Sequence, residues 1–227
     1  MIAPMKAATN LLILLTTAFA VAQATEKYDL TWKPKEGDTK KYVVRLTMNE
    51  SPKIEVSGTL TSKVLKSTGG GKNEVEISCT DFKALMDGQP TNEFEPQPTT
   101  VFKLGRNGLG ESMTVQGSQI LSTVLLFSSY LPEKPVGVGE TFKVAWQSKG
   151  GNGSMDGEGK FESIEEKDGK KIALLKWKAS VQPDDVDGAA ELVLESRFEL
   201  ASWTLISTKA TGNTPGGEIS FSLTPAK

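Results

Sequence analysis

GSQILSTVLLFSSYLPEKPVGVGETF, residues 117–142, is the stretch around which the rest of the chain is arranged. Its first part predicts a helix over 118–131, because apolar residues recur there at spacings of three and four and so line one helix face. These residues are Ile120, Leu121, Val124, Leu125, Phe127 and Leu131. Ser118 supplies the N-terminal cap. Pro132 ends the helix, because the residue before a proline is disfavoured in helical conformation.

The predicted helix carries no charged residue, so we expect protein to cover most of its surface. It is too short to span a bilayer, which requires about 20 apolar residues. Two interpretations remain open. The helix either packs on a sheet as part of a core, or it forms a lid over an apolar cavity.

The N-terminus has the three parts of a secretory signal peptide. Lys6 supplies positive charge, residues 11–21 are apolar, and Ala22-Gln23-Ala24 has the small-x-small pattern of a cleavage site. We expect residues 1–24 to be removed near Ala24/Thr25, and the mature chain to be secreted or periplasmic. An uncleaved N-terminal anchor is the alternative. No cysteine stands directly after the apolar run, so no lipid anchor is expected. We also expect no integral membrane segment in the mature chain.

The composition excludes several kinds of chemistry. The 227 residues contain no histidine and one cysteine, Cys79, which removes Ser-His-Asp and Cys-His nucleophilic sites, histidine-ligated zinc and any internal disulfide. The acidic run at 184–188 lacks the ligand spacing of a calcium loop. Cys79 alternates with Val75 and Ile77, which predicts a small buried side chain. We therefore expect no catalytic residue, no metal and no cofactor.

The charge pattern bears on possible partners. Lysine and arginine number 26, aspartate and glutamate 28, and the formal net charge is −2. A nucleic-acid-binding surface shows clustered basic residues. Because the charges here are dispersed, we expect no nucleic-acid partner.

Outside the predicted helix the dominant period is two residues, the period of a half-buried strand. It is clearest in two sets of alternating apolar residues: Tyr42, Val44, Leu46 and Met48, and Leu192, Leu194, Phe198 and Leu200. We expect one mainly β domain, residues 25–227, with about 10–11 antiparallel strands. Sheets of this size curl, close or split. The predicted fold is a large curved antiparallel sheet or open barrel, covered by the helix.

The strand-like segments on either side of the helix follow the same order. This order predicts two degenerate half-repeats, about 28–115 and 132–224, linked by the helix. Gly37 then matches Gly139, Gly58 matches Gly159, and Phe102 matches Phe198. Unrelated β-meanders of similar layout are the alternative interpretation.

The tryptophans are the best candidates for a binding site. Trp146 and Trp177 fall on the inward faces of two neighbouring predicted strands, near the helix. Core packing is one interpretation, and the wall of an apolar ligand cleft is the other. The candidate ligand-binding residues are Leu121, Val124, Leu125, Trp146 and Trp177.

One phrase carries a resemblance. Lys134-Pro135-Val136-Gly137-Val138-Gly139-Glu140-Thr141-Phe142 resembles a phrase of a large group of uncharacterised secreted bacterial β-rich proteins, in which KPVxVG, an acidic residue, Thr or Ser, and an aromatic residue precede a strand. The resemblance covers most of the mature chain in strand order and implies no known activity. The expected layout is similar to LolA-type periplasmic lipoprotein-carrier and lipid-binding folds, a likeness of architecture that does not determine function.

Together these observations favour a non-catalytic binding protein for an acyl chain or another apolar ligand. The alternative is a structural or protein-interaction module of the bacterial envelope, with an envelope protein as its partner. An enzyme is the third possibility. An open apolar cavity beneath residues 121–127 would favour the first function, and a filled core with an exposed sheet edge would favour the second.

Overall fold

Strands dominate the computed structural model, which describes residues 26–68, 71–96, 98–113, 122, 130–150, 153–182 and 188–226. The strands of these residues are β1 (Lys27–Tyr28), β2 (Thr39–Asn49), β3 (Ile54–Lys66), β4 (Asn73–Met86), β5 (Gln89–Pro90), β6 (Thr99–Leu104), β7 (Val136–Gly137), β8 (Thr141–Gln147), β9 (Ser154–Lys167), β10 (Lys170–Gln182), β11 (Ala190–Glu199), β12 (Thr204–Thr214) and β13 (Gly217–Pro225). The prediction of a mainly β fold is confirmed.

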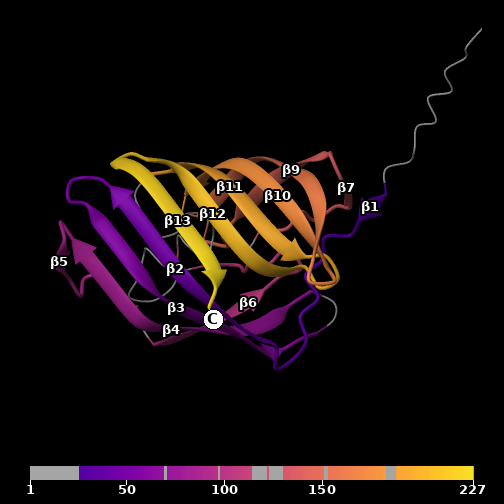
Figure 1. Ribbon diagram of the computed structural model, residues 1–227, viewed down its shortest axis with the longest axis horizontal. Helices are drawn as coiled ribbons and strands as arrows, with labels where there is room; N and C mark the ends of the chain where they lie inside the picture. The colour runs from indigo at the N-terminus through magenta and orange to yellow at the C-terminus, as the bar shows by residue number, and fades with distance from the viewer. Residues whose placement is uncertain are drawn as a thin grey trace, which may run out of the picture.

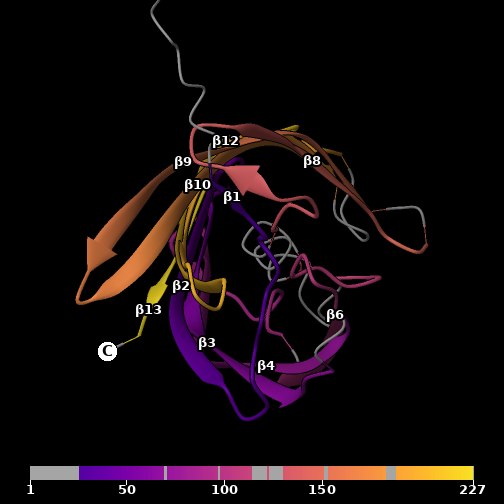
Figure 2. The same cartoon turned by 90° about the vertical axis from the view of Figure 1, so that its right-hand side faces the viewer.

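Eleven of these strands form one antiparallel sheet. Its order is β5-β4-β3-β2-β13-β12-β11-β10-β9-β8, with β6 paired to β4 on the same side as β5. Figure 1 shows the long strands side by side in a single layer, and Figure 2, seen from the end, shows that this layer curls around an interior. Among the described residues no hydrogen-bonded pairing joins β8 to β5 or β6, so the curved sheet does not close into a barrel.

The curvature has a local basis in the strand registers. The pairing shifts in the β3–β4, β9–β10 and β11–β12 pairs, for example between Leu174 and Leu175 and between Arg197 and Phe198. Such irregularities bend a strand and increase its right-handed twist. Long strands with several of them curl and leave one concave face.

The concave face holds the core. The alternation predicted from sequence places Val44 and Leu46 of β2 inward, together with Leu192 and Leu194 of β11, and all four are buried. On the opposite face, residues such as Lys41 are exposed. One face is therefore dry and the other solvated, as is common for antiparallel sheets.

Residues 26–38, here called the N-terminal strap, cross one end of the curved sheet (Figure 2). β1 pairs with β7 through Lys27–Gly137 and Tyr28–Val136. Further along, the amide of Trp32 donates to the carbonyl of Arg106 (3.1 Å) and the amide of Lys33 donates to that of Ser202 (3.0 Å). Leu30 lies between these ties with 0% of its surface exposed. The strap thus connects segments that are far apart in the sequence.

Two turns of the same construction precede β2 and β8. Gly37 and Gly139 have φ angles of 87° and 85°. Their amides donate to the carbonyls of Val64 (2.9 Å) and Phe161 (2.6 Å). In each turn a carboxylate accepts a hydrogen bond from the backbone amide three residues earlier. Asp38 accepts from Lys35 (2.8 Å), and Glu140 accepts from Gly137 (2.9 Å). The two glycines that the sequence comparison matched, Gly37 and Gly139, therefore occupy equivalent positions in two similar turns.

The predicted match of Gly58 with Gly159 does not hold at the residue level. Gly58 pairs with Val44, seven residues after Gly37, whereas Gly159 pairs with Phe142, three residues after Gly139. The physical reason is register. The first strand of the hairpin is longer in β2–β3 (11 residues in β2) than in β8–β9 (7 residues in β8), so residues at similar distances from the two glycines occupy different strand positions.

Most of the predicted helix, like the predicted signal peptide, falls outside the described residues. Its last two residues, Tyr130 and Leu131, are described, buried and not helical. The amide of Leu131 donates to the carbonyl of Asn107 (2.9 Å) instead of bonding within a helical turn. The predicted C-terminal end at 131 is therefore too late. No helix among the described residues has the length and apolar character needed to cross a membrane.

Candidate functional site

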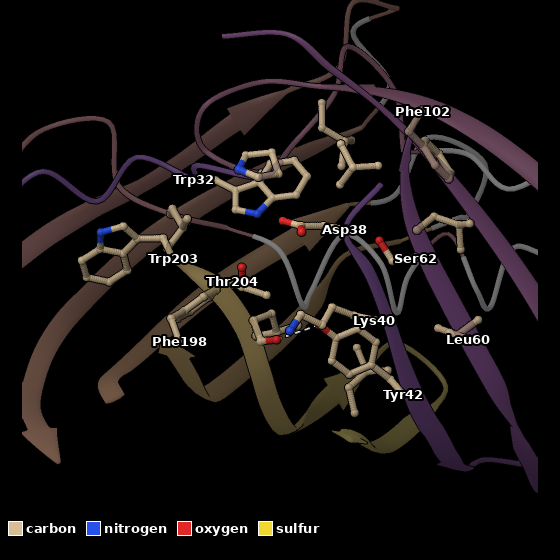
Figure 3. A pocket seen from close by; sticks show the side chains of 18 of the residues that line it. Trp32, Asp38, Lys40, Tyr42, Leu60, Ser62, Phe102, Phe198, Trp203 and Thr204 are labelled. Carbon is tan, nitrogen blue, oxygen red and sulfur yellow. Dashed lines mark hydrogen bonds between the residues drawn. The ribbon is translucent and has the colours of Figure 1, made fainter. Parts of the chain in front are cut away.

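An apolar cavity of about 110 Å³ lies on the concave side, between strands β2, β3, β4 and β6, the N-terminal strap and the turn that joins β11 to β12. Buried side chains form most of its wall. They include Tyr42, Leu60, Phe102 and Phe198 (Figure 3), and also Leu104 and Leu223. A dry cavity of about 150 Å³ in another protein holds a benzene molecule. The space here suits an apolar group of similar or slightly smaller size.

Strand alternation and register bring these residues together. On β2, Lys40 and Tyr42 point to the same side because they are two residues apart. Their partners on β3 are Ser62 and Leu60, so four residues of one hairpin face the cavity. Phe102 of β6 also faces the cavity, and its cross-strand partner on β4 is Val75.

Tyr42 forms a fixed part of the wall. Its hydroxyl donates to the carbonyl of Leu205 at 2.6 Å, a contact between residues 163 positions apart (Figure 3). Burial raises the pKa of the Tyr42 phenol well above its ordinary range, so it stays protonated at every physiological pH. A phenol that is protonated and already bonded holds a shape and supplies no general base.

Two tryptophans also line the cavity. Trp32 comes from the N-terminal strap, and Trp203 from the β11–β12 turn. Trp203 has a φ angle of 52°, a left-handed conformation that a bulky residue adopts rarely and at a cost in energy. Its ring packs against Phe161 and Phe198, with centroids 6.1 and 6.4 Å away. These ring contacts offset the backbone cost and hold the indole inside.

The mouth of the cavity is polar. Asp38 and Lys40 line it and are exposed, and Ser62 and Thr204 add hydroxyl groups (Figure 3). One carboxylate oxygen of Asp38 accepts the Lys35 amide. Lys40 takes part in none of the ion pairs that the described residues form. The cavity thus has an apolar interior and a charged rim.

The predicted binding residues are only partly placed by the structure. Leu121, Val124 and Leu125 lie outside the described residues. Trp146 is half-buried, and its indole donates to the carbonyl of Gly110 at 2.9 Å. Trp177 is 3% exposed. Neither tryptophan lines the cavity.

Trp146 lies on β8 and Trp177 on β10, so the prediction that their strands are neighbours is wrong, because β9 lies between them. Their partners on β9 are Met155 and Gly159, four residues apart, which corresponds to about 13 Å along a strand. Trp177 instead packs edge-on against Tyr130, with ring centroids 6.3 Å apart. Its indole N–H has no acceptor among the described residues.

Sequence reasoning missed Trp32, Phe198 and Trp203 as cavity residues. Trp32 lies in a segment without strand periodicity, and Trp203 lies in a turn. The signal that was available is modest. Trp32 precedes Pro34 in an otherwise polar segment, which indicates an apolar anchor in an irregular stretch.

Cys79 lies on the concave side beside Leu60 and is half-buried, so it is less covered than its alternation predicted. Burial, with a smaller contribution from the Asp81 carboxylate, raises the pKa of the Cys79 thiol to about 11. Among the described residues no group of three or more His, Cys, Asp or Glu side chains is arranged to hold a metal ion.

No protein-family model matches this chain, and no curated protein or solved structure is significantly similar to it. The fold and the cavity are therefore the basis on which a function can be assigned to this chain.

Proposed function

We propose that this is a secreted or periplasmic, non-catalytic binding protein whose ligand places an apolar group in the cavity. The observation that carries the proposal is an apolar cavity on the concave face that opens through a polar mouth at Asp38 and Lys40. Binding sites for small molecules are commonly concave, mostly apolar, and supplied with a few polar groups that orient the ligand. The location rests on the predicted signal peptide.

The energetics favour a binding site over a packing defect. An enclosed void costs about 24 cal/mol per Å³, so for 110 Å³ the cost is at most about 2–3 kcal/mol, because this cavity is open at its mouth. That is a large share of the ~5–15 kcal/mol by which domains are stable. A bound apolar group restores the missing contacts and offsets this loss.

The size of the cavity limits the ligand. A benzene-sized space takes an aromatic ring or the end of a short acyl chain. Each methylene group buried contributes about 0.8 kcal/mol, which is about a fourfold gain in affinity. The affinity should therefore rise with chain length until the cavity is full and then stop rising.

A series of n-alkanols from butanol to decanol tests this. The readout is the fluorescence of Trp32 and Trp203, supported by calorimetry. We expect about a fourfold gain per methylene group, followed by a plateau. The Leu60→Phe variant fills the cavity and should weaken every alkanol at least tenfold. Val193→Phe is the matched control, because Val193 is 48% exposed on the convex face. Binding that ignores chain length, or that survives Leu60→Phe, would overturn the proposal.

As part of this proposal, the predicted helix over 118–131 covers the concave face of the sheet. Its support is that Leu131, the last residue of the predicted helix, lines the cavity, and that the preceding Tyr130 is buried. Leu121, Val124 and Leu125 are then the proposed ligand contacts on that helix. Trp146 and Trp177 would support the cover from the sheet.

We also propose that the two halves of the chain arose by duplication. The support is the pair of similar turns at Gly37 and Gly139. Each turn begins a run of antiparallel neighbours, β2-β3-β4-β6 and β8-β9-β10-β11. When the two runs are superposed on their turns, β3 should fall on β9, β4 on β10 and β6 on β11. Turns that align while the strands after them diverge would show that the likeness is local.

The alternative function, a protein-interaction module of the envelope, is favoured by one observation. β6 pairs with β4 along one edge, and on its other edge the described residues form a single bridge, between Leu104 and Gly110. Val101 of β6 is 53% exposed. Such an edge accepts an added strand from a partner. Val101→Lys would weaken capture of a partner protein and leave alkanol binding unchanged.

A further inference from the structure

We propose that the ligand is an amphiphile with an anionic head group, and that the Lys40 ammonium at the cavity mouth binds this head. The inference rests on the proposed function and makes it more specific. The apolar part of the ligand occupies the cavity between Tyr42 and Phe102. The head remains at the solvent boundary.

The position of Lys40 is the first argument. Lys40 lies two residues before Tyr42 on β2 and therefore on the same, inward face of the strand. Its cross-strand partner Ser62 also lines the cavity (Figure 3). Two residues along a strand span about 7 Å. A carboxylate one short step outside the apolar space therefore lies within reach of the flexible lysine chain, with the Ser62 hydroxyl as a second donor.

The charges around Lys40 are the second argument. Asp38 shares the mouth, and one of its carboxylate oxygens already accepts the Lys35 amide at 2.8 Å. Glu199 lies close enough for Lys40 to contribute to the lowering of its pKa, but its main partners are Lys170, at 2.9 Å, and the Ser202 hydroxyl. Both nearby acids are engaged by other donors.

Lys40 itself takes part in no ion pair among the described residues. An exposed ammonium at the rim of an apolar space complements an anion and repels a cation. The pairing is exposed to solvent, so it supplies selectivity and a modest gain in affinity, while most of the affinity comes from the apolar group.

The test uses four six-carbon probes that differ only in the head: hexanoate, hexyl phosphate, hexanamide and hexylammonium. Affinities are measured by calorimetry at low ionic strength. We expect the anions to bind about two- to fivefold more tightly than hexanamide, the range for an exposed pair. Hexylammonium should bind more weakly than hexanamide. Comparison of the first two probes distinguishes a carboxylate head from a phosphate head.

Two variants assign the effect to one residue. Lys40→Met keeps the length of the side chain and removes its charge, so it should reduce hexanoate affinity to that of hexanamide and leave hexanamide unchanged. Lys41→Met is the matched control, because Lys41 is the next residue, is exposed, and faces the convex side. It should change neither affinity. Added salt should weaken hexanoate binding in the wild type and in Lys41→Met, and should leave it unchanged in Lys40→Met.

The outcomes separate this inference from the function on which it rests. If hexanamide binds and hexanoate is no tighter, or if Lys40→Met leaves the preference intact, the head-group assignment is wrong and the apolar site stands. If no probe binds at all, the proposed function fails together with it. If hexylammonium is preferred, Asp38 and not Lys40 determines selectivity, and the assignment is reversed.

Discussion

The hydroxyl of Tyr130 donates to the carbonyl of Lys143 at 2.9 Å, on the edge strand β8. The same oxygen accepts the amide of Ala145 at 3.4 Å. Lys143 and Ala145 are alternate residues of one strand, so a single phenol occupies the position that a neighbouring strand would take. An edge covered in this way is less available for pairing with another molecule.

Replacing Tyr130 by Phe should therefore destabilise the protein. Burial raises the pKa of the Tyr130 phenol, which keeps it a hydrogen-bond donor at neutral pH. Its loss leaves a backbone carbonyl and an amide without their partner, at a cost of about 1–3 kcal/mol. Urea denaturation measures the difference. Tyr28→Phe is the control, because within the described part of the chain the Tyr28 hydroxyl donates to the exposed Glu26 carboxylate and to no other group. Equal effects of the two variants would show that the edge contact contributes little.

Gly159→Ala should be more damaging than a glycine substitution on the surface. A Cβ at Gly159 would lie 2.3 Å from the ring of Phe142, its partner across β8 and β9. Phe142 in turn stacks on Tyr130, with centroids 6.5 Å apart, so the clash would disturb both rings. Overpacking of this kind costs about 1–3 kcal/mol. At Gly150 a Cβ meets nothing within 4 Å, so Gly150→Ala should leave the melting temperature nearly unchanged.

The reaction of Cys79 with an alkylating reagent should depend steeply on pH. Its pKa is raised to about 11, so at pH 8 almost all of the thiol is protonated and unreactive. The rate should rise about tenfold per pH unit up to that pKa, whereas an unfolded control in urea should level off near pH 9. The folded state binds the proton more tightly, so this group contributes stability below pH 9 that is lost as the pH rises towards 11. A plateau near pH 8 in the folded protein would mean that Cys79 is freely exposed.

The attachment of the N-terminal strap should weaken in acid. The Lys27 ammonium, 2.7 Å from Glu140, and the Gly137 amide lower the pKa of Glu140 below its ordinary 4.5. Because the folded pKa is depressed, the stabilising contribution is present above pH 4.5 and is lost as the pH falls through the lower folded value. The wild type should therefore lose melting temperature below pH 4.5 relative to Glu140→Gln. Glu36→Gln, an exposed change elsewhere in the strap, should follow the wild type at every pH.

Leu125→Ala separates the two interpretations of the predicted helix. If the helix fills a core, the substitution should cost about 2–5 kcal/mol and leave alkanol binding unchanged. If it covers the cavity, we expect a loss nearer ~1 kcal/mol and a clear change in alkanol affinity, because that side chain then faces ligand or void. We expect the second result. A large loss of stability with unaltered binding would leave the helix a purely structural role.

The sequence by itself determined the fold class and the inward faces of its strands. A period of two leaves no choice about which residues share a face, so Val44, Leu46, Leu192 and Leu194 were predicted inward and are buried. It also determined that these 227 residues contain no histidine side chain and no pair of cysteines for an internal disulfide. The similar turns at Gly37 and Gly139 could be recognised because each turn is formed by a few consecutive residues.

The cavity was decided only by the tertiary structure. Its wall joins Trp32, Tyr42 and Phe102 to Phe198 and Leu205, from segments up to about 170 positions apart. Whether such residues meet depends on strand register and sheet curvature, which accumulate over many pairings and leave no local signal. Trp146 and Trp177 are the opposite case, residues that the sequence predicted to lie close together and that the structure separates. Each lies on a strand that pairs with β9, but register separates them by four residues, and so the tryptophans expected to form a site lie apart.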